Sequence, residues 1–577
     1  MNNFKGIGAS EGIEIAKAYR LVMPEFPIPM NLLPEDAIDE SKQKVSAAFE
    51  RANEQLREIK AIAQKKLGID KANIFQAHIE ILNDPTLRNQ INDQIENKRS
   101  NPLCAVSTAF DNVHNIFANM SDAYFKERAA DILDLKQRML AILTNQPLPD
   151  LLSIQSEVII VADDLTPSQT SLLDKNFVKG FITNTGGRTS HAAIIARSLE
   201  IPAILGLGNI TETIGDNELI AIDGATGIVA NSLSAEDIQM WKDKQQDFLD
   251  NKNDLQNYLA PVAITKDKHE VVVCGNIGKV SDMEKINKYG GKGVGLFRTE
   301  VLYMDNVNWP DEAQQFDSYK AVVQQANNEL VIIRTLDIGG DKTLPYYTFE
   351  SEMNPFLGYR AIRLCLDQPQ IFKTQLKALL RAAAFGPLGI MFPMIATIDE
   401  LKQAKAILNE CIDELKTTNV PIGQPLVGMM IEIPSAAVMS EMFAPYVDFF
   451  SIGTNDLVQY SFAVDRMSRS VSYLYQPLNP ALLRLIKMTI DGGKKHQVWT
   501  GMCGEMAGDP LAIPLLLGLG LKEFSMSAAS MLKAKKIINS INYQDCVDLA
   551  NKALNCEDAQ SVNNLVVKFL KENNIKI

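Results

Sequence analysis

Cysteine is scarce in this sequence. Only 7 of the 577 residues are cysteines, and no two of them form a CxxC pair. An odd number of scattered cysteines argues against a disulfide framework, and the missing CxxC pairs argue against a structural zinc site. The positions are Cys104, Cys274, Cys365, Cys411, Cys503, Cys546 and Cys556.

Histidine is scarcer still, with 5 residues in the whole chain. Any chemistry that needs an imidazole must therefore use one of very few side chains. They are His78, His114, His191, His269 and His496. His78 and His114 lie within apolar helical stripes, where packing is the simpler explanation.

Long apolar runs and an excess of basic residues are also missing. No stretch approaches the roughly 18 apolar residues that a membrane helix needs. The first residues lack the basic-then-apolar pattern of a signal peptide. The net charge of −13 argues against broad nucleic-acid binding, which needs a basic surface. We therefore expect a cytoplasmic protein with no membrane insertion and no nucleic-acid partner.

The composition is that of an ordinary globular protein. Hydrophobic residues make up 46% and charged residues 22% of the chain, close to the average for soluble proteins. At roughly 150 residues per domain, the length predicts about two to four domains.

The first half of the chain changes character twice. Apolar residues recur at three- and four-residue steps over much of 31–146, which predicts an inserted bundle of amphipathic helices. Short β-branched runs before and after it predict one small α/β domain formed by 1–30 together with 147–230. Residues 231–260 are polar and helical, and predict a stiff connecting helix.

Residues 261–577 show a repeated alternation of apolar runs and helical stretches. Eight runs over about 300 residues are the number and size expected of a (β/α)₈ barrel. An open doubly wound sheet is the alternative, but no GxGxxG turn is present. The predicted strands are Val271–Ile277, Val294–Phe297, Val331–Leu336, Gly389–Pro393, Val427–Ile433, Phe449–Ile452, Val498–Met502 and Glu523–Met526.

Charged residues follow several of these predicted strands. Because such barrels perform their chemistry at the carboxyl ends of the strands, these side chains are expected to converge at one mouth. Arg298, Arg334 and Arg466 supply planar cations suited to carboxylate and phosphate oxygens. Glu432 and Asp456 are candidate ligands for Mg²⁺, which binds a few carboxylates together with substrate oxygens and water. The set predicts a small, multiply anionic phosphate substrate bound with a metal.

Cys503 follows the seventh predicted strand. A buried, inert thiol is the ordinary explanation for a cysteine. At this position a thiol, with a reference pKa of about 8.5, could instead donate a proton to a metal-bound enolate.

One histidine has a distinctive setting, the segment GGRTSHAAIIAR at 186–197. Thr189 or Ser190 is a suitable N-cap, so His191 is expected near a helix N-terminus, where a phosphate on the ring would be stabilised. Arg188 adds positive charge. A capping or packing role is the alternative on spacing alone.

These segments resemble Enzyme I of the bacterial phosphoenolpyruvate:sugar phosphotransferase system over essentially the whole chain. The motifs that carry the resemblance are GGRTSHAAIIARSLEIPAI (186–204), GVGLFRTEVLYM (293–304), RTLDIGGDK (334–342), NPFLGYRAIR (354–363), MFPMI (391–395), DFFSIGTNDLVQY (448–460), AVDR (463–466) and WTGMCGEMAGD (499–509).

The resemblance implies a role for each matching residue. His191 is the phosphorylated histidine and Cys503 the proton donor to enolpyruvate. The metal ligands for Mg²⁺ are Glu432 and Asp456. The residues implied to bind phosphoenolpyruvate are Arg298, Arg334, Asn455, Asp456 and Arg466, with Lys342 and Arg360 as additional candidates.

The resemblance also implies the domain roles. Residues 1–30 and 147–230 form a swivelling phosphohistidine domain, 31–146 bind the phosphocarrier protein HPr, 231–260 form a helical linker, and 261–577 bind phosphoenolpyruvate and form the homodimer. Two departures from the family pattern are Glu11 in Ser10-Glu11-Gly12 and the pair Ala192-Ala193.

Three other interpretations remain at this stage. A phosphoenolpyruvate synthase or pyruvate phosphate dikinase would need an ATP-binding domain ahead of the histidine, and no Gly-rich nucleotide loop is present. The nitrogen-regulatory form of Enzyme I normally carries an extra N-terminal sensor domain, whereas this chain begins at the Gly8-Ala9-Ser10 motif. A non-catalytic scaffold would be expected to lose charged site residues, and all are retained.

Overall fold

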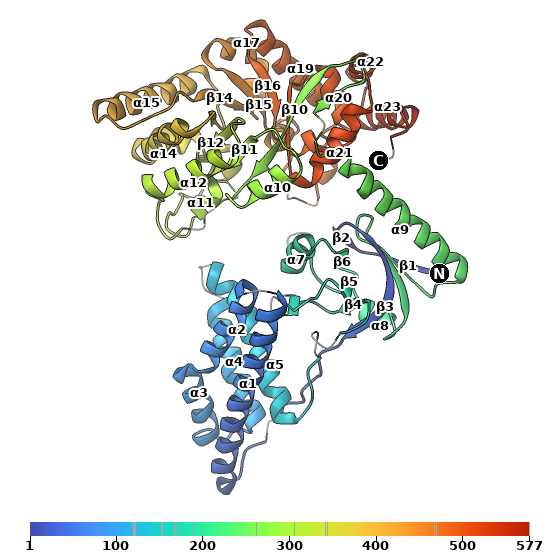
Figure 1. The fold of residues 1–577 in the computed structure, drawn as a ribbon. Helices are drawn as coiled ribbons and strands as arrows, with labels where there is room; N and C mark the ends of the chain where they lie inside the picture. Colours follow the sequence, from blue (N-terminus) through green and yellow to red (C-terminus); the bar gives the residue numbers. More distant parts are fainter. Residues whose placement is uncertain are drawn as a thin grey trace. The chain divides into compact units, whose positions relative to one another are not determined.

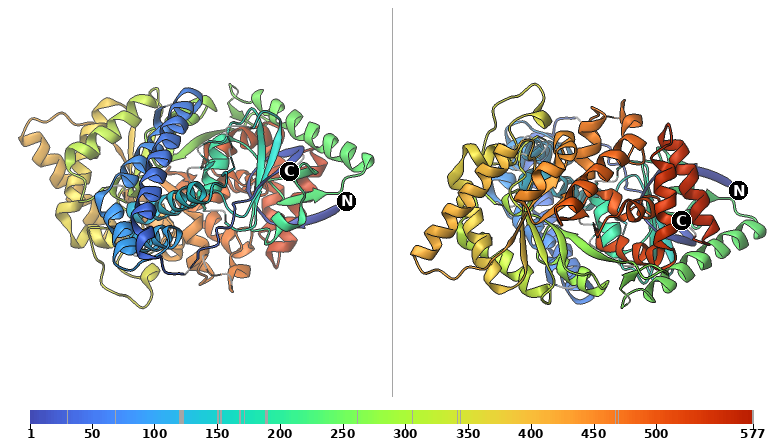
Figure 2. Two further views of the ribbon diagram at one scale, coloured as in Figure 1. Left: turned by 90° about the horizontal axis from the view of Figure 1, so that it is seen from below. Right: turned by 90° about the horizontal axis from the view of Figure 1, so that it is seen from above.

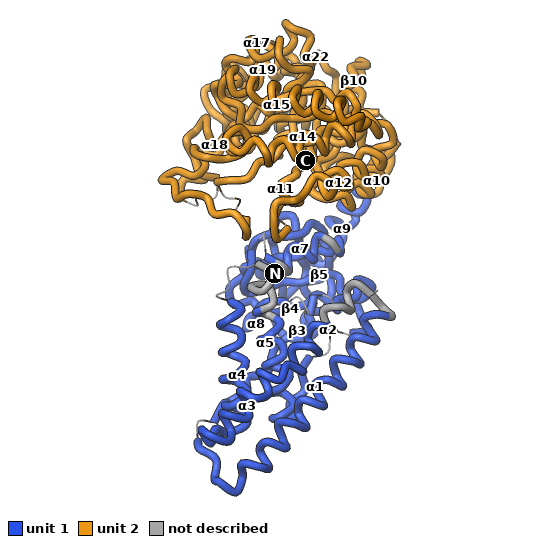
Figure 3. Tube along the Cα trace, turned by 90° about the vertical axis from the view of Figure 1, so that its left-hand side faces the viewer, with its two compact units in different colours: residues 1–252 blue, residues 253–577 orange. Residues whose placement is uncertain are grey.

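The computed structural model divides into two compact units, Met1–Lys252 and Asn253–Ile577 (Figure 3). It describes residues 1–575 except residues 30, 68, 119–122, 150, 152–153, 167–168, 171, 188–189, 261, 305, 341, 343, 467 and 469. Among the described residues, no helix is both long and apolar enough to cross a membrane.

The first unit contains an eight-stranded mixed sheet with the strand order β1-β8-β7-β3-β4-β5-β6-β2. Strands β3, β4, β5 and β6 pair in parallel, and the remaining pairs are antiparallel. The strands are β1 (Asn2–Lys5), β2 (Ile7–Ser10), β3 (Ile13–Leu21), β4 (Val158–Ala162), β5 (Val178–Thr183), β6 (Ala203–Leu205), β7 (Leu219–Asp223) and β8 (Ile228–Asn231). The N-terminal residues thus complete a sheet formed mainly by residues after 157, as the sequence predicts.

A helical bundle is inserted between β3 and β4 (Figure 1). Its helices are α1 (Ile38–Leu67), α2 (Ile69–Leu82), α3 (Pro85–Glu96), α4 (Pro102–Ala118) and α5 (Ala123–Thr144). The predicted apolar stripe of α1 is buried in one core with side chains of the other helices, including Phe110 and Met139. Helix α3 begins at Pro85, where the carboxylate of Asp84 accepts the backbone N–H of Thr86, an arrangement that satisfies a free donor of the first turn.

Helix α9 (Ala235–Gln256) crosses the limit between the two units. It is one unbroken helix in both views of Figure 2. Trp241 is buried against strands β7 and β8 through Ala221 and Ala230, and Gln245 donates to the carbonyl of Ile13 at 3.1 Å. The first half of α9 is therefore fixed to the sheet of the first unit.

The second unit is a closed barrel of eight parallel strands. Each neighbouring pair from β10 to β17 is parallel, and β10 also pairs with β17. The strands are β10 (Glu270–Ile277), β11 (Val294–Arg298), β12 (Val331–Arg334), β13 (Leu388–Phe392), β14 (Leu426–Ile431), β15 (Phe449–Ile452), β16 (Trp499–Met502) and β17 (Glu523–Met526). All eight predicted strands are confirmed, and closure excludes the open-sheet alternative.

Helices surround the barrel strands (Figure 1). Alternate strand residues face inward, where Leu296, Ile332, Met391, Met430 and Phe449 form an inner layer. The outward residues pack against the helices in one large core, the usual arrangement of a TIM-type barrel. The longer helices are α12 (Glu312–Gln325), α14 (Pro369–Ala382), α15 (Ile398–Thr417), α19 (Pro480–Lys495), α21 (Ala528–Asn539), α22 (Tyr543–Ala553) and α23 (Ala559–Glu572). Shorter helices are α10 (Asp282–Lys288), α11 (Glu300–Met304), α13 (Ile362–Asp367), α16 (Pro434–Val438), α17 (Ser440–Phe443), α18 (Thr454–Ser461) and α20 (Ile513–Leu519).

In the described part of the second unit, one strand was not predicted. Strand β9 (Ala263–Ile264) pairs antiparallel with the start of β10. Two residues are too few to show the alternation that identifies a strand in a sequence.

Candidate active site at the barrel mouth

The barrel brings most of the predicted site residues to one rim. Arg298 and Arg334 are the last residues of β11 and β12, and Glu432 directly follows β14. Asp456 lies in the first turn of α18 after β15, and Cys503 directly follows β16. Because all strands are parallel, their carboxyl ends share one end of the barrel. The convergence predicted from the sequence is therefore present.

Arg334 is the most constrained of the predicted cations. It is 6% exposed, and its Nη2 pairs with the carboxylate of Glu300 and lies 2.9 Å from Oδ2 of Asp337. Burial alone would lower the Arg334 pKa, but the carboxylates of Asp337, Glu300 and Glu432 raise it overall. The guanidinium is therefore permanently charged, and its Nε has no hydrogen-bond partner among the described residues.

Lys342 and Arg360 belong to the same charge network. The Lys342 ammonium lies 2.9 Å from both Glu300 and Asp337. Arg360, 2% exposed, lies 2.8 Å from Asp337 and 3.4 Å from Asp456. The carboxylates thus hold both cations beside the predicted anion site.

Glu432 has an unsatisfied oxygen. Its side chain is fully buried, and Oε1 accepts the backbone N–H of Met394 at 2.6 Å. Oε2 has no hydrogen-bond partner among the described residues. Burial, reinforced by the negative charges of Asp456 and Asp337, raises the Glu432 pKa to about 8. The positive charges of Arg334 and Arg360 lower this pKa only in part, so the unpartnered Oε2 could accept a further cation.

A divalent metal would supply that cation, so Glu432 and Asp456 fit the predicted metal site. Among the described residues, no group of three or more His, Cys, Asp or Glu side chains could hold a metal ion. Two carboxylates leave most positions around Mg²⁺ for substrate oxygens and water, as is common for this ion.

Cys503 is 2% exposed and joins the inner layer of barrel residues. Burial raises its thiol pKa to about 11, although Ser451 and the positive charges of Arg334 and Arg298 lower it. The thiol is therefore protonated throughout the neutral range. It is buried, as the ordinary explanation holds, but it lies within the electrostatic reach of two predicted substrate-binding cations.

Two further predicted residues follow β15. Asn455 exchanges hydrogen bonds with Glu505 across to the end of β16. Arg466 lies beyond α18, where its backbone N–H donates to Gln459 at 3.3 Å. Burial is the main cause of the raised pKa of Tyr475, and the charges of Glu505, Arg466 and Asp456 also affect this pKa. Arg466 therefore lies in the same electrostatic environment as the other groups.

His191 lies in the first unit, at the first residue of helix α7 (His191–Leu199). Ser190 is the N-cap, and its side chain accepts the backbone N–H of Ala193 at 3.3 Å. The predicted helix start is therefore confirmed. Gly186 adopts a φ of +99° in the preceding turn, a conformation that favours glycine. Arg188, Thr189 and the His191 side chain lie outside the described part of the chain.

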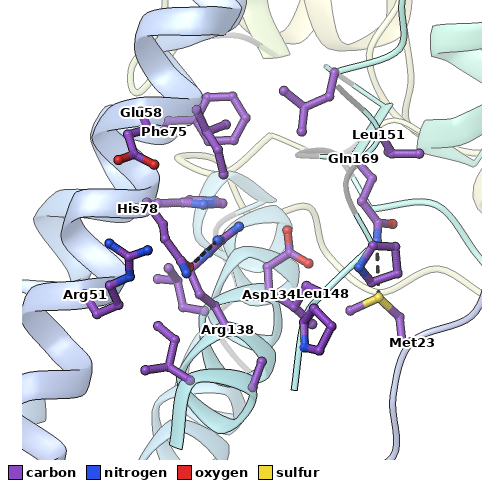
Figure 4. A pocket seen from close by; sticks show the side chains of 18 of the residues that line it. Met23, Arg51, Glu58, Phe75, His78, Asp134, Arg138, Leu148, Leu151 and Gln169 are labelled. Atoms are coloured by element: carbon purple, nitrogen blue, oxygen red, sulfur yellow. Dashed lines mark hydrogen bonds between the residues drawn. The ribbon is translucent and has the colours of Figure 1, made fainter. Parts of the chain in front are cut away.

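The first unit also contains a cavity of about 620 Å³ between the helical bundle and the sheet domain (Figure 4). His78, 2% exposed, lines it and lies 3.3 Å from Asp131. Asp134 accepts a hydrogen bond from Thr166, and burial raises its pKa to about 6. His78 thus packs in a groove, as predicted.

Three residues of the barrel mouth could not be assigned a role from the sequence, namely Glu300, Asp337 and Glu505. All three occur in the quoted motifs after predicted strands. Their position at strand ends was the available signal, but only the closed barrel shows which cation or amide each one contacts.

Comparison with known families matches three regions of the chain. They are the PEP-utilising enzyme PEP-binding domain at 252–543, the N-terminal domain at 5–128 and the mobile domain at 154–227. The three models correspond to the barrel, to the N-terminal strands with most of the helical insert, and to the sheet domain.

Curated relatives match over their full length. The phosphoenolpyruvate-protein phosphotransferase of Mycoplasma pneumoniae is 54% identical, with 100% of each chain covered. That of Mycoplasma genitalium is 53% identical over 100% of each chain, and that of Staphylococcus carnosus is 48% identical over 98% of this chain and 99% of its own. A solution structure titled Enzyme I has 36% identity and a TM-score of 0.40, and covers 42% of this chain and 99% of its own. The full-length identities show that the chain belongs to the phosphoenolpyruvate-protein phosphotransferase family.

Proposed function

We propose that the chain transfers the phosphoryl group of phosphoenolpyruvate to its own His191, releases pyruvate, and passes the group to the phosphocarrier protein HPr, as the first step of sugar uptake by the phosphotransferase system. The observation that carries the proposal is the ring of cations, carboxylates and one thiol at the barrel mouth. The full-length relatives support it, because their name states this donor and a protein acceptor.

Substrate binding is assigned to the cations of the rim. Phosphoenolpyruvate carries a phosphate and a carboxylate, which suit Arg298, Arg334 and Arg466. Glu300 and Asp337 fix Arg334 before the substrate arrives, so little reorganisation is required on binding. Asn455 and Asp456 complete the assigned set, and Lys342 and Arg360 stay additional candidates.

The metal is assigned to Glu432 and Asp456, and we propose Mg²⁺. When bound, it would neutralise charge on the substrate oxygens, the main contribution expected in phosphoryl transfer. The unpartnered Oε2 of Glu432 supports this assignment.

The reaction transfers one phosphoryl group to His191 and one proton to a carbon atom of enolpyruvate. A ring nitrogen of His191, Nε2 by family resemblance, forms a bond to phosphorus as the bond from phosphorus to the enol oxygen breaks. The electron pair left on enolpyruvate takes a proton at carbon from Sγ of Cys503, which gives pyruvate. The raised thiol pKa keeps that proton available at neutral pH, and the thiolate is reprotonated from solvent.

His191 and the barrel mouth belong to different units. The proposal therefore includes movement of the histidine domain between the barrel and HPr, with the helical insert 31–146 as the HPr-binding part and 231–260 as the linker. A covalent cross-link between the units that left full turnover would contradict this movement. Homodimerisation through the barrel and a cytoplasmic location belong to the same proposal.

The test is phosphorylation with ³²P-labelled phosphoenolpyruvate and Mg²⁺. We expect an acid-labile, base-stable phosphoprotein that forms without ATP and loses its label to HPr. His191→Ala should abolish labelling, whereas His496→Ala, at an exposed position, should keep it. Labelling that requires ATP would contradict the proposal and favour the dikinase alternative.

A further inference from the structure

We propose that Glu505 is a positioning residue, which fixes the amide of Asn455 so that an N–H group is presented to the anionic substrate. The inference rests on the proposed function, because it concerns an assigned substrate-binding residue. It adds Glu505, which had no role in the sequence analysis.

The two residues occupy equivalent places on neighbouring strands. Strands β15 and β16 are parallel, with Ile452 opposite Met502 in the register. Asn455 and Glu505 each lie three residues beyond that last pair. The barrel geometry therefore brings the two loops side by side at the rim.

The loops also approach each other unusually closely. A Cβ atom at Gly504 would lie 1.9 Å from Oγ1 and 2.6 Å from the backbone nitrogen of Thr454. Any larger residue would force the loops apart, because these distances are far below van der Waals contact. Gly504 thus allows Asn455 and Glu505 to meet.

Two hydrogen bonds join them. The backbone N–H of Glu505 donates to Oδ1 of Asn455 at 3.1 Å. Nδ2 of Asn455 donates to Oε1 of Glu505 at 3.4 Å. A backbone N–H can only donate and an ionised carboxylate can only accept, so both bonds require the same orientation of the amide.

This orientation matters for an anionic substrate. The amide NH₂ has two hydrogens, of which one is used by Glu505, and the other is left to donate to a substrate oxygen. The reversed amide would turn its oxygen toward the carboxylate of Glu505. Both groups are also next to a cavity of about 250 Å³ lined by Tyr475, Asp509 and Met506, so the amide is accessible at the mouth.

The orienting effect can be separated from the effect of charge. Glu505→Ala removes the side-chain acceptor and is expected to raise the KM for phosphoenolpyruvate about threefold to tenfold, the range for one hydrogen bond, with kcat within about twofold. Glu505→Gln keeps an acceptor oxygen and is expected to retain or lower the wild-type KM. If Glu505 acted only by repelling the anion, both substitutions would lower KM.

A double-mutant cycle with Asn455 completes the test, measured as KM in pyruvate release by the full chain. Asn455→Ala should raise KM, and adding Glu505→Ala should raise it no further. Asp317→Asn, an exposed change on α12 of the same unit, should leave KM unchanged. Thermal unfolding of each variant checks that the barrel is intact, and Glu505→Gln supplies the comparison if the alanine variant is unstable.

Three results would overturn the inference. These are an unchanged or lowered KM for Glu505→Ala, an equal increase in the Asn455→Ala background, and an unchanged KM for Asn455→Ala itself. In each case wild-type turnover persists, so the proposed function stands. Absence of any phosphoenolpyruvate turnover by the wild-type chain would instead remove the proposed function together with this inference.

Discussion

Arg334 and Asp337 form a buried ion pair at the end of strand β12, with 2.9 Å between Nη2 and Oδ2. The exposed fractions are 6% for Arg334 and 1% for Asp337. Asp337 also contacts Lys342 and Arg360, so one carboxylate holds three cations of the mouth. Burial would raise the Asp337 pKa, but these three cations lower it well below its usual range.

Asp337→Asn is therefore expected to destabilise the barrel. Removing one partner of a buried pair leaves uncompensated charge and typically costs about 3–5 kcal/mol. Urea unfolding of the full chain should show the loss, together with a raised KM for phosphoenolpyruvate. Asp317→Asn, at an exposed position of the same unit, should change neither quantity. Equal stability of the two variants would show that the network does not support Arg334.

The eight barrel strands could be predicted because each is a compact apolar run between helical stretches. Arg298 and Arg334 could be predicted as site residues because each ends such a run. The pairing of Arg334 with Glu300 could not be predicted, because it depends on β11 and β12 lying side by side, with Arg298 opposite Arg334. A one-dimensional pattern does not contain that neighbour relationship.

The properties of Cys503 show the same limit. Its position after a strand was readable, and it suggested a proton donor with an ordinary thiol pKa. The raised pKa of about 11 results from burial inside the closed barrel. For His191, the glycines and Ser190 predicted the helix start because capping is encoded locally.

Metal binding should depend on both carboxylates of the mouth. Glu432→Gln and Asp456→Asn are each expected to weaken binding of Mn²⁺, used as a paramagnetic probe, because two protein ligands leave no substitute for either. Phosphoenolpyruvate should tighten binding in the wild-type chain by adding oxygen ligands. Electron paramagnetic resonance of free Mn²⁺ measures both effects. Glu557→Gln, an exposed change, is the control, and wild-type affinity in Glu432→Gln would contradict the site.

Cys503→Ala should slow enzyme-catalysed pyruvate formation by about 10²–10⁴-fold, the usual contribution of a general acid. Because the thiol pKa is about 11, the wild-type rate should show no titration of this group between pH 6 and pH 9. Cys556→Ala, at a half-buried position, should leave the rate of pyruvate formation unchanged. Stopped-flow detection of pyruvate distinguishes the variants, and full turnover by Cys503→Ala would remove the thiol from the mechanism.

Glu523, at the start of β17, should make the barrel less stable as the pH rises. Burial raises its pKa from 4.5 to about 7. Below pH 4.5 the carboxyl is neutral in both folded and unfolded chains. Between pH 4.5 and 7 the carboxyl is ionised in the unfolded chain but still protonated in the folded chain. The contribution of Glu523 to the free energy of unfolding therefore falls through this window by on the order of 3 kcal/mol. Above pH 7 this contribution is constant. In Glu523→Gln the decrease should become smaller, because the amide does not titrate, and the part that remains includes the contribution of Glu432, whose pKa is also raised. The measurement is urea unfolding at pH 5 and pH 8, followed by tryptophan fluorescence, with the exposed Glu557→Gln as a matched control that should keep the wild-type difference. The comparison uses the change between the two pH values, so any constant cost of burying the glutamine amide cancels. An undiminished pH dependence in Glu523→Gln would show that another group titrates in this window.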